Sequence, residues 1–360
     1  MTATEVLAIH REMVKTPSVS GSEAELADWA EGYLRQLGAE VWRIGNSVVA
    51  RAGSGPKLMF DTHLDTVPVA PGWTRDPWKA TLQDGAIYGL GANDAKASGA
   101  AMIGAFASVA ESDGPCEMVL ALVEQEETTN LGTLNALTFL REQLNWTPSA
   151  AVVGEPTELQ VGVAQRGLLI LEIVAKGTVC HSARADELGA TNAILELADD
   201  LVLLNGLSVG PADPFLGKPS LQVTVVKAGD VHNRLPSEAV ATLDIRTVPG
   251  LSHEEIAVNI QRQLKNEVRV KSKRLEPYAC ATDHAIVAAA LASLPGSKAF
   301  GSATMSDQVH FKGIPCIKCG PGVSTRSHTV EEFVFESEII RGFEFYARLI
   351  GEFSRAMGVA

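Results

Sequence analysis

Apolar and polar residues alternate along the first part of the chain in blocks that predict strands and helices in turn. Strands are predicted by the short apolar runs EVWRI, SVVARA and KLMFDTH, and a helix is predicted to begin near Lys96 and run through GAAMIGAFASVA. The segment 117–124 reads EMVLALVE and is almost wholly apolar, as expected for a strand covered on both faces. A helical pattern over about 130–143 and the strand pattern SAAVVG follow. This alternation predicts an α/β fold with a mainly parallel sheet.

The pattern changes near residue 166. Strands are then predicted by GLLILEIVAKG, LQVTVVKAGD, EAVATLDIRTV and EVRVKSKRL, with one helix after the first strand and one before the last. The resulting order β-α-β-β-α-β is the ferredoxin-like arrangement. We therefore predict a discontinuous α/β domain over 1–165 and 275–360, interrupted by an inserted α+β domain over 166–274. A long amphipathic helix is predicted from about Ser337.

Two helices are predicted to begin at capping boxes, in which a Ser and a Glu three residues later cap each other's backbone N–H groups. The pairs are Ser22 with Glu25 and Ser252 with Glu255. Gly38 is predicted to end the first of these two helices.

The composition favours a folded protein that binds neither nucleic acid nor a membrane. The 360 residues are 46% hydrophobic and carry a formal net charge of −13. Nucleic acids and anionic membranes both require a basic face, so this charge disfavours them as partners. No apolar stretch reaches the length of a membrane span, and the N-terminus lacks the regions of a signal peptide. A cytoplasmic location is therefore expected.

The five cysteines do not form a disulfide framework, because they are scattered and odd in number. Cys316 and Cys319 form a CxxC pair, but a zinc ribbon would need a second pair. The two residues lie in the apolar stretch IPCIKCG, which predicts a buried strand. We interpret them as small core residues rather than a redox or metal site.

Side chains of the types that bind metal ions follow several of the predicted strands, and one of them lies in the Gly-rich turn GLGANDAK. These two histidines and five carboxylates are His63, Asp65, Asp94, Glu126, Glu127, Glu155 and His328. The carboxyl ends of strands in an α/β sheet are where ligands bind. Each signal alone is common, since a His-x-Asp or Glu-Glu pair is usually solvated. Together, and with no Cys among them, they predict a zinc site and fit a two-metal site best.

The residue types suggest separate roles within such a site. His63 is expected to be a neutral imidazole ligand. Asp65, two residues on, is expected to accept the other ring N–H of His63 and so fix its tautomer. Asp94 can bridge two cations with its two carboxylate oxygens.

The remaining side chains complete this scheme. Glu127 and Glu155 are expected to give one carboxylate to each metal ion, and His328 to complete the second. Glu126 is then left without a metal. Adjacent loop residues point in different directions, so Glu126 is expected to act as general base on water and then as the acid that protonates the leaving amine.

These residues lie in motifs that span nearly the whole chain. The motifs are HLDTVP (63–68), WTRDPW with DGAIYGLGANDAK (73–96), EQEET (124–128), VGEPTELQ (153–160), CHSARADELGATNAI (180–194), NRLPSEAVATLDIR (233–246) and GPG with SHTVEEFV (320–334). In this order they resemble the M20 metallopeptidase family of acetylornithine deacetylase, succinyl-diaminopimelate desuccinylase and carboxypeptidase G. The resemblance implies a zinc-dependent, exopeptidase-like α/β catalytic domain with an inserted ferredoxin-like lid that commonly dimerises.

The resemblance implies the same metal scheme as the residue types. His63 and Glu155 would hold one zinc ion, and Glu127 and His328 the other, with Asp94 bridging. Asp65 would support His63, and Glu126 would be the base. The peptide bond between Asp94 and Ala95 is expected to be cis.

The resemblance also assigns residues outside the metal site. His181 matches a lid histidine that reaches the partner subunit's active site and stabilises the oxyanion of the reaction. Arg246 and Asn233 match lid positions that hold the substrate carboxylate, a task suited to the guanidinium fork. Ser306 with Asp307 resembles the Ser-Asp pair of the desuccinylase substrate loop, although GSATMSD departs from that pattern.

We expect a metal-dependent amidohydrolase that removes an N-acyl group from an α-amino acid, with N-acetylornithine as the favoured substrate and arginine biosynthesis as the context. Two Zn²⁺ ions are the expected cofactors, with Co²⁺ or Mn²⁺ as possible substitutes. A homodimer through the lid is the expected assembly.

Several alternatives stay open at this point. Succinyl-diaminopimelate desuccinylase needs a second anion site, for which the Ser306 loop is the only hint. A dipeptidase or carboxypeptidase of the same family would share the machinery. An enzyme that releases lysine or ornithine from an acidic carrier protein should be basic around its site, against the overall charge. An inactive binding protein on the same fold should have lost a ligand or the base.

Overall fold

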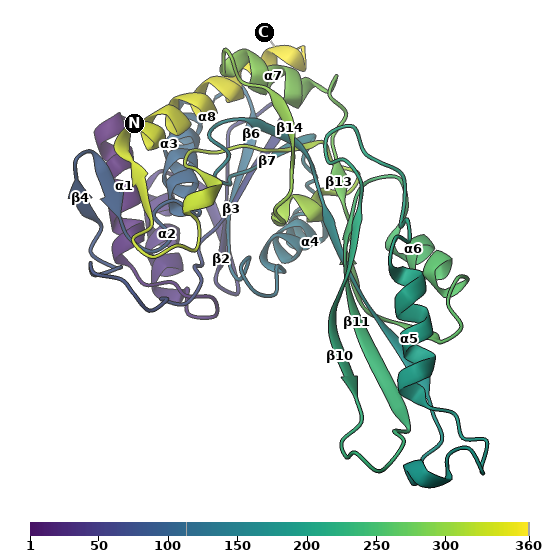
Figure 1. The fold of residues 1–360 in the computed structure, drawn as a ribbon. Coiled ribbons are helices and arrows are strands. Elements are labelled where there is room, and N and C mark those ends of the chain that lie inside the picture. The colour runs from purple at the N-terminus through teal and green to yellow at the C-terminus, as the bar shows by residue number, and fades with distance from the viewer. Residues whose placement is uncertain (113, 359–360) are drawn as a thin grey trace. The chain divides into compact units, whose positions relative to one another are not determined.

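The computed structural model describes residues 1–112 and 114–358 (Figure 1). The chain divides into two compact units, each formed by segments that are discontinuous in sequence. The first unit comprises Met1–Val163, Cys280–Phe300 and Ser306–Ala360, and the second comprises Ala164–Ala279 and Gly301–Met305.

A mixed sheet forms the centre of the first unit. Its strands in spatial order are β1 (Glu40–Ile44), β2 (Ser47–Ala52), β6 (Glu117–Val123), β3 (Lys57–His63), β7 (Ala150–Val153), β15 (Cys316–Lys318) and β8 (Val161–Gln165). Strand β3 lies between β6 and β7 and is parallel to both, and β15 is parallel to β7. The pairings of β2 with β6, β1 with β2, and β15 with β8 are antiparallel. The prediction of a mainly parallel sheet therefore holds at the centre and not at the edges.

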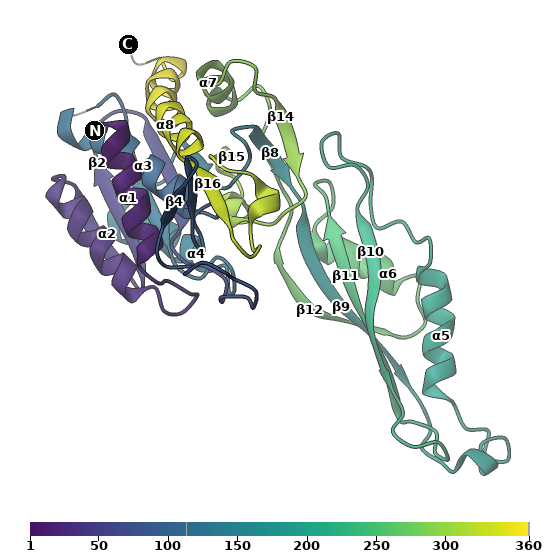
Figure 2. The ribbon, with the colours of Figure 1, turned by 60° about the vertical axis from the view of Figure 1, so that its left-hand side comes forward.

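Helices cover this sheet in two groups (Figure 2). The first group is α1 (Ala3–Lys15), α3 (Lys96–Ser112), α7 (Ala285–Ser293) and α8 (Glu336–Ala356), which pack on one another. The second group is α2 (Ala24–Gln36), which packs on β1 and β2, and α4 (Gly132–Leu144), which packs on β6. The connections β3–α3–β6 and β6–α4–β7 cross the sheet in opposite directions. Because such connections are right-handed, α3 and α4 lie on opposite faces.

A small second sheet stands beside the metal-binding motifs of the first unit. Its order is β16 (Phe333–Phe335), β5 (Ala86–Tyr88) and β4 (Thr81–Gln83). Phe333 lies opposite Tyr88, and their rings are 5.2 Å apart. This pairing fixes the segment before β16, which contains His328, next to the turn after β5.

The second unit has the predicted ferredoxin-like order. Its elements along the chain are β9 (Gly167–Lys176), η1 (Ser182–Arg184), α5 (Ala193–Leu204), β10 (Ser220–Ala228), β11 (Glu238–Thr247), α6 (His253–Gln261) and β12 (Glu267–Leu275). The strands form an antiparallel sheet in the order β10-β11-β9-β12. Alternate residues of β11 are buried and pack with α5 and α6, as the period-two pattern of its sequence predicts. Two short strands, β13 (Tyr278–Ala279) and β14 (Ala299–Ser302), pair with β8.

The structure confirms one predicted capping box and corrects the other. Ser252 and Glu255 cap each other's backbone N–H groups at the start of α6. Helix α2 instead begins after Glu23 and has no side-chain cap. The Glu23 side chain is fully buried and accepts hydrogen bonds from Gly21 N at 2.8 Å and Gln125 N at 3.2 Å. The carboxylate that could have capped the helix therefore joins two loops instead.

Cys316 and Cys319 are buried, reduced thiols on and directly after β15, which confirms their prediction as core residues. Within the described ranges, none of the helices has the length and hydrophobicity needed to cross a membrane.

Candidate metal centre

His63 ends strand β3 with its imidazole almost completely buried. Its Nδ1 lies 2.9 Å from the backbone oxygen of Asp65 and 3.5 Å from the Asp65 carboxylate. The backbone oxygen is therefore the nearer acceptor, where the sequence suggested the carboxylate. Its Nε2 faces Asp94 Oδ1 at 3.3 Å and Glu155 Oε1 at 3.8 Å. Burial opposes protonation, but hydrogen bonds with Asp65 and Asp94 outweigh it and raise the pKa of His63 well above its usual range. Loss of the Nε2 proton would leave the lone pair that a metal ion needs.

The Asp65 carboxylate is fully buried and organises the loop after strand β6. Its oxygens accept hydrogen bonds from Glu126 N at 3.0 Å, Glu127 N at 3.1 Å and Ser20 Oγ at 2.6 Å. Burial opposes its ionisation, but hydrogen bonds with His63 and Ser20 outweigh burial and lower the pKa of Asp65. Asp65 is thus an ionised anchor for two consecutive residues of a neighbouring strand end.

Glu126 and Glu127 are adjacent in sequence but have different partners. The chain turns just before them, because Gln125 has a positive φ of 57°. Glu127 Oε1 lies 2.7 Å from His328 Nε2. Glu126 Oε1 accepts a hydrogen bond from Asn130 Nδ2 at 3.3 Å.

Asp94 lies between the two histidines. Its Oδ1 is 3.3 Å from His63 Nε2, and its Oδ2 is 3.7 Å from His328 Nε2. Ligand atoms of His63, Asp94 and Glu127 all lie within 4.8 Å of one another. Direct contacts pair His63 with Glu155 and His328 with Glu127, and Asp94 contacts both histidines. Three carboxylates and two imidazoles are a donor set that fits two divalent cations.

Glu332 holds the turn that carries Asp94, and sequence reasoning did not identify it. This buried carboxylate accepts hydrogen bonds from Gly91 N at 3.0 Å, Asn93 N at 2.8 Å and Asp94 N at 2.9 Å. The only signal was its place in SHTVEEFV, where Glu331 and Glu332 could not be told apart. The Asp94–Ala95 peptide bond in this turn is cis, as expected.

The centre carries more negative charge than its surroundings can stabilise. Burial and the nearby Asp94 raise the pKa of Glu155 to about 8. Burial and the charges of Glu155 and Asp307 raise the pKa of Glu126 well above its usual range. The hydrogen bond with Glu127 raises the pKa of His328 to about 9. Glu155 and His328 thus favour their protonated forms at positions where bound cations would otherwise balance the carboxylates.

Lys318 is another residue that sequence reasoning missed. It ends β15 with its side chain buried. Burial lowers its pKa, and the carboxylates of Glu155, Glu126 and Asp94 oppose this change. The nearby carboxylates thus favour the charged form of this buried amine, whereas its burial disfavours it.

Ser306, expected to contact substrate, is fully buried in the first unit and precedes a 3₁₀ helix, η2 (Asp307–Phe311). Its hydroxyl accepts a hydrogen bond from Gln308 N at 3.4 Å and so caps that helix. Asp307 is also buried and is bonded to Asn130 Nδ2 at 2.9 Å. A contact between Ser306 and substrate stays a prediction.

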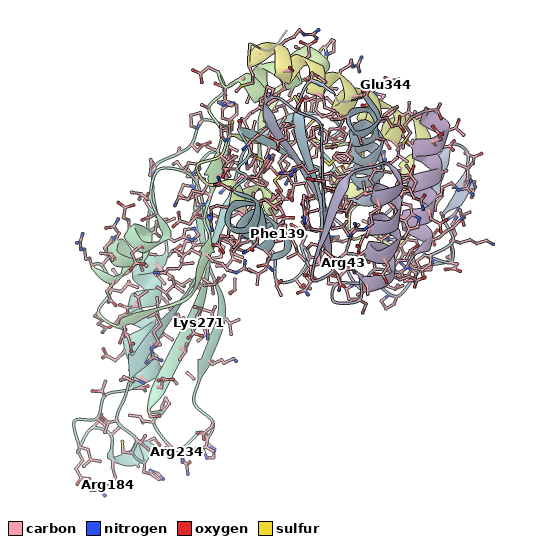
Figure 3. The ribbon with its side chains drawn as sticks, turned by 180° about the vertical axis from the view of Figure 1, so that it is seen from behind. Arg43, Phe139, Arg184, Arg234, Lys271 and Glu344 are labelled. Carbon is pink, nitrogen blue, oxygen red and sulfur yellow. The ribbon has the colours of Figure 1, made fainter. Side chains whose placement is uncertain are left out.

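His181 and Asn233 lie side by side in the second unit. Ser182 N donates to Asn233 O at 3.0 Å, and the backbones of His181 and Arg234 form an isolated antiparallel β-bridge. Both segments belong to the end of this unit at which Figure 3 labels Arg184 and Arg234.

Arg246 lies near the other end of the same sheet. It is eight residues beyond Glu238, the first residue of β11, or about 27 Å away at ~3.4 Å per residue. Its guanidinium pairs with Asp244 at 2.9 and 3.3 Å. Within one chain, Arg246 is therefore too far from His181 and Asn233 to touch the same small molecule.

Known proteins resemble this chain in sequence and in fold. Residues 59–352 match the sequence profile described as Peptidase family M20/M25/M40. The chain is 28% identical to the succinyl-diaminopimelate desuccinylase of Sulfurimonas denitrificans, over 96% of this chain and 99% of that protein. It is 27% identical to the acetylornithine deacetylase of Proteus mirabilis, over 97% of both.

Among solved structures, the fold resembles the YXEP protein of Bacillus subtilis, described as a dinuclear metal-binding peptidase of the M20 family. The TM-score is 0.74 at 16% identity, over 99% of this chain and 98% of that one. The profile match covers most of the sequence, and the fold similarity extends over nearly all of it. The chain therefore belongs to peptidase family M20/M25/M40, whose members hydrolyse amide bonds.

Proposed function

We propose that this protein is a two-zinc amidohydrolase that removes the acyl group from an N-acyl-α-amino acid, most favourably N-acetylornithine. The observation that carries the proposal is the pair of histidine–carboxylate groups that share Asp94, with Glu126 beside them. The inactive-protein alternative requires a missing ligand or base, and all six side chains are present.

In this proposal His63 and Glu155 hold one ion, Glu127 and His328 hold the other, and Asp94 contacts both. Zinc bound there would polarise the scissile carbonyl and lower the pKa of water. Asp65 keeps the imidazole of His63 and the backbone of Glu127 in place, since it contacts both segments. The chain thus supplies a rigid ligand set from separate strand ends.

Glu126 is the proposed proton carrier. Its side chain is half-buried, and one carboxylate oxygen is held by Asn130. It takes a proton from the attacking water and delivers it to the departing amine nitrogen, which leaves as a free amino group. Burial and the charges of Glu155 and Asp307 raise the pKa of Glu126, which favours the proton-accepting half of this role.

The buried Ser306–Asp307 pair supports an acetyl over a succinyl substrate. A succinyl group carries a carboxylate that needs a cationic or donor-rich pocket. Asp307 is itself acidic, is buried and already accepts a hydrogen bond from Asn130. This loop is therefore a poor second anion site, although the relatives include a succinyl-diaminopimelate desuccinylase as well as an acetylornithine deacetylase.

The second unit presents a surface suited to a second copy of the chain. The two edges of its sheet differ: β12 carries Arg269, Lys271 and Lys273, whereas the middle of β10 exposes Val223, Val225 and Val226. Charged edges resist pairing and apolar ones favour it. The adjacent helix α5 exposes Leu195, Val202 and Leu203, of which Val202 is 75% exposed.

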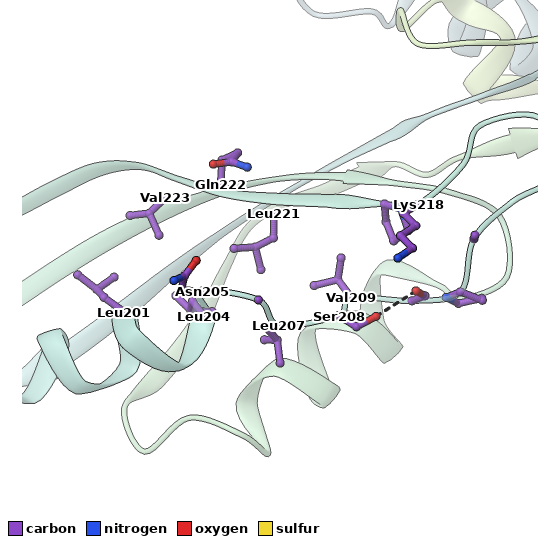
Figure 4. Close-up of a pocket in the computed structure, with 15 residues that line it drawn as sticks. Leu201, Leu204, Asn205, Leu207, Ser208, Val209, Lys218, Leu221, Gln222 and Val223 are labelled. Carbon is purple, nitrogen blue, oxygen red and sulfur yellow. Dashed lines mark hydrogen bonds between the residues drawn. The ribbon is translucent and has the colours of Figure 1, made fainter.

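A groove of about 740 Å³ lies between the end of α5, the segment after it and β10 (Figure 4). Its lining includes Leu201, Leu204, Leu207, Val209 and Leu221. We propose that this face is the homodimer interface. The wide separation of Arg246 from His181 supports the same conclusion, because one substrate can meet both only if two chains contribute.

The test is a comparison of substrates with zinc-loaded protein. The proposal expects the highest kcat/KM for N-acetyl-L-ornithine, less for N-succinyl-L,L-diaminopimelate and least for simple dipeptides. The Glu126→Gln variant should bind zinc normally and lose turnover by orders of magnitude. Near-normal turnover in that variant would remove Glu126 from the mechanism, and a preference for the succinylated substrate would reverse the choice of acyl group.

A further inference from the structure

Asn130 is a buried amide placed between Glu126 and a second carboxylate. Its Nδ2 donates to Glu126 Oε1 at 3.3 Å and to Asp307 Oδ1 at 2.9 Å. An amide nitrogen carries two hydrogens, so one is available for each carboxylate. Asn130 is only 5% exposed, and Asp307 is 1% exposed.

The orientation of this amide is set by His310. The Nε2 of His310 lies 2.6 Å from the backbone oxygen of Asn130 and 2.7 Å from its Oδ1. Both atoms are acceptors, so this nitrogen must carry the ring hydrogen. A reversed amide would place NH₂ against an N–H donor and an oxygen against two carboxylates. His310 therefore directs the Asn130 nitrogen toward Glu126.

The backbone at Asn130 is equally constrained. Its φ of 52° lies in the left-handed region, which Asn tolerates better than most residues. Its N–H donates to Gln125 O at 2.7 Å and closes the loop that carries Glu126. On the other side, Asp307 begins η2, and Asn130 precedes α4 by two residues. The hydrogen bond thus links Glu126 to regular elements outside the metal-binding loop.

We propose that Asn130, clamped by His310, is a positioning residue that holds one oxygen of Glu126 and leaves the other aimed at the attacking water. The inference rests on the proposed role of Glu126 as proton carrier. Asn130 touches neither a proposed metal ligand nor the substrate in this scheme. Its loss should therefore slow the chemical step without changing metal binding or substrate affinity.

Asn130→Gly is the informative variant, because glycine keeps the positive φ while removing the amide. Asn145→Gly is a matched control, since Asn145 follows the other end of α4 with a φ of 49° and is exposed. With N-acetyl-L-ornithine and zinc-loaded protein, we expect Asn130→Gly to lower kcat by about 10- to 100-fold, the cost of a misplaced catalytic group. KM and zinc content should stay within about twofold of the unchanged protein, and Asn145→Gly should leave kcat unchanged.

Two further measurements separate this role from general damage and from failure of the proposed function. Adding Asn130→Gly to Glu126→Gln should cause no further loss, because the residue acts only through Glu126. Crystal structures of the two glycine variants should show a displaced Glu126 carboxylate in Asn130→Gly alone.

An unchanged kcat, an unmoved Glu126 carboxylate, or a full additional loss in the double variant would overturn the positioning role. Normal turnover in Glu126→Gln would instead refute the proposed base. The structural comparison decides the positioning role even if none of the substrates tested is hydrolysed.

Discussion

The carboxylate of Asp65 accepts a hydrogen bond from the backbone N–H of Glu126 at 3.0 Å. The same side chain reaches the N–H of Glu127, and Asp65 also contacts the imidazole of His63. One buried carboxylate therefore joins the ends of strands β3 and β6. The position of the proposed base and the positions of two proposed metal ligands depend on it together.

Replacing Asp65 by Asn tests this shared dependence. The side-chain NH₂ of Asn would face backbone N–H donors or the His63 ring, so at least one of these hydrogen bonds is lost. We expect kcat to fall about 10- to 100-fold, with weaker zinc binding, as for other groups that support metal ligands. Ser20→Ala is the control, since it removes one donor to Asp65 and leaves the carboxylate in place. Equal effects of the two variants on zinc affinity would contradict the account.

The Asp94→Asn substitution tests whether Asp94 bridges two metal ions. An amide has one oxygen and no charge, so it cannot join two cations as a carboxylate does. We expect zinc content to fall from two ions per chain to one or fewer, and hydrolysis to be lost. Asp84→Asn makes the same substitution at an exposed turn residue and should change neither. Metal analysis after gel filtration gives the answer, and two tightly bound ions in Asp94→Asn would exclude a bridging role.

Much of this site could be predicted because ligands occupy strand ends. His63 ends one buried strand and Glu155 follows another, and an apolar run that ends in such side chains is visible in sequence. The supporting groups were not predictable in the same way. Glu332 and Asn130 act through contacts with residues 177 to 241 positions away, such as Gly91 and Asp307. Local pattern carries no record of those contacts.

The failed capping box at Ser22 has the same cause. The local rule favoured a Ser–Glu pair at a helix start, but tertiary hydrogen bonds of Glu23 determined how the chain enters α2. The ferredoxin-like order was predictable because alternation along β11 and its neighbours reflects burial of one sheet face. The placement of Arg246 and Asn233 toward opposite ends of the sheet of the second unit was not predictable, because both residues lie in one sequence motif.

The metal-free protein should lose stability as pH rises. Burial and Asp94 raise the pKa of Glu155 from 4.5 to about 8, and the bond with Glu127 raises that of His328 from 6.5 to about 9. At a pH between the ordinary and the raised pKa of either group, the folded chain binds more protons than the unfolded chain. The contribution of Glu155 to the free energy of unfolding is therefore fully present below about pH 4.5, and that of His328 below about pH 6.5. Both contributions are lost as the pH rises toward 9.

Zinc should reverse this trend because it replaces those protons. We expect the difference in Tm between zinc-loaded and chelated protein to widen from pH 5.5 to pH 8. Thermal unfolding followed by circular dichroism at several pH values measures it. A difference that stays constant or narrows over this range would show that these groups do not bind the metal.

The proposed dimer face can be tested with one charge. Val202→Asp places a carboxylate on the exposed face of α5, where it would be buried between copies without a partner. We expect this variant to be monomeric by light scattering and to lose most activity if two chains complete the site. Val258→Asp is the control, because Val258 is an exposed side chain on α6, and this variant should remain dimeric and active. A Val202→Asp variant that dimerises as well as the unchanged protein would place the interface elsewhere.

The central claim is that two metal ions, shared through Asp94, make this chain an amide hydrolase. The most direct measurement is the release of ornithine from N-acetyl-L-ornithine as zinc is added stepwise to metal-free protein. The account predicts no release with chelator present and activity that reaches its maximum at two equivalents of zinc per chain. Full activity without metal, or no hydrolysis of any acylated amino acid or dipeptide by protein that holds two ions, would contradict it.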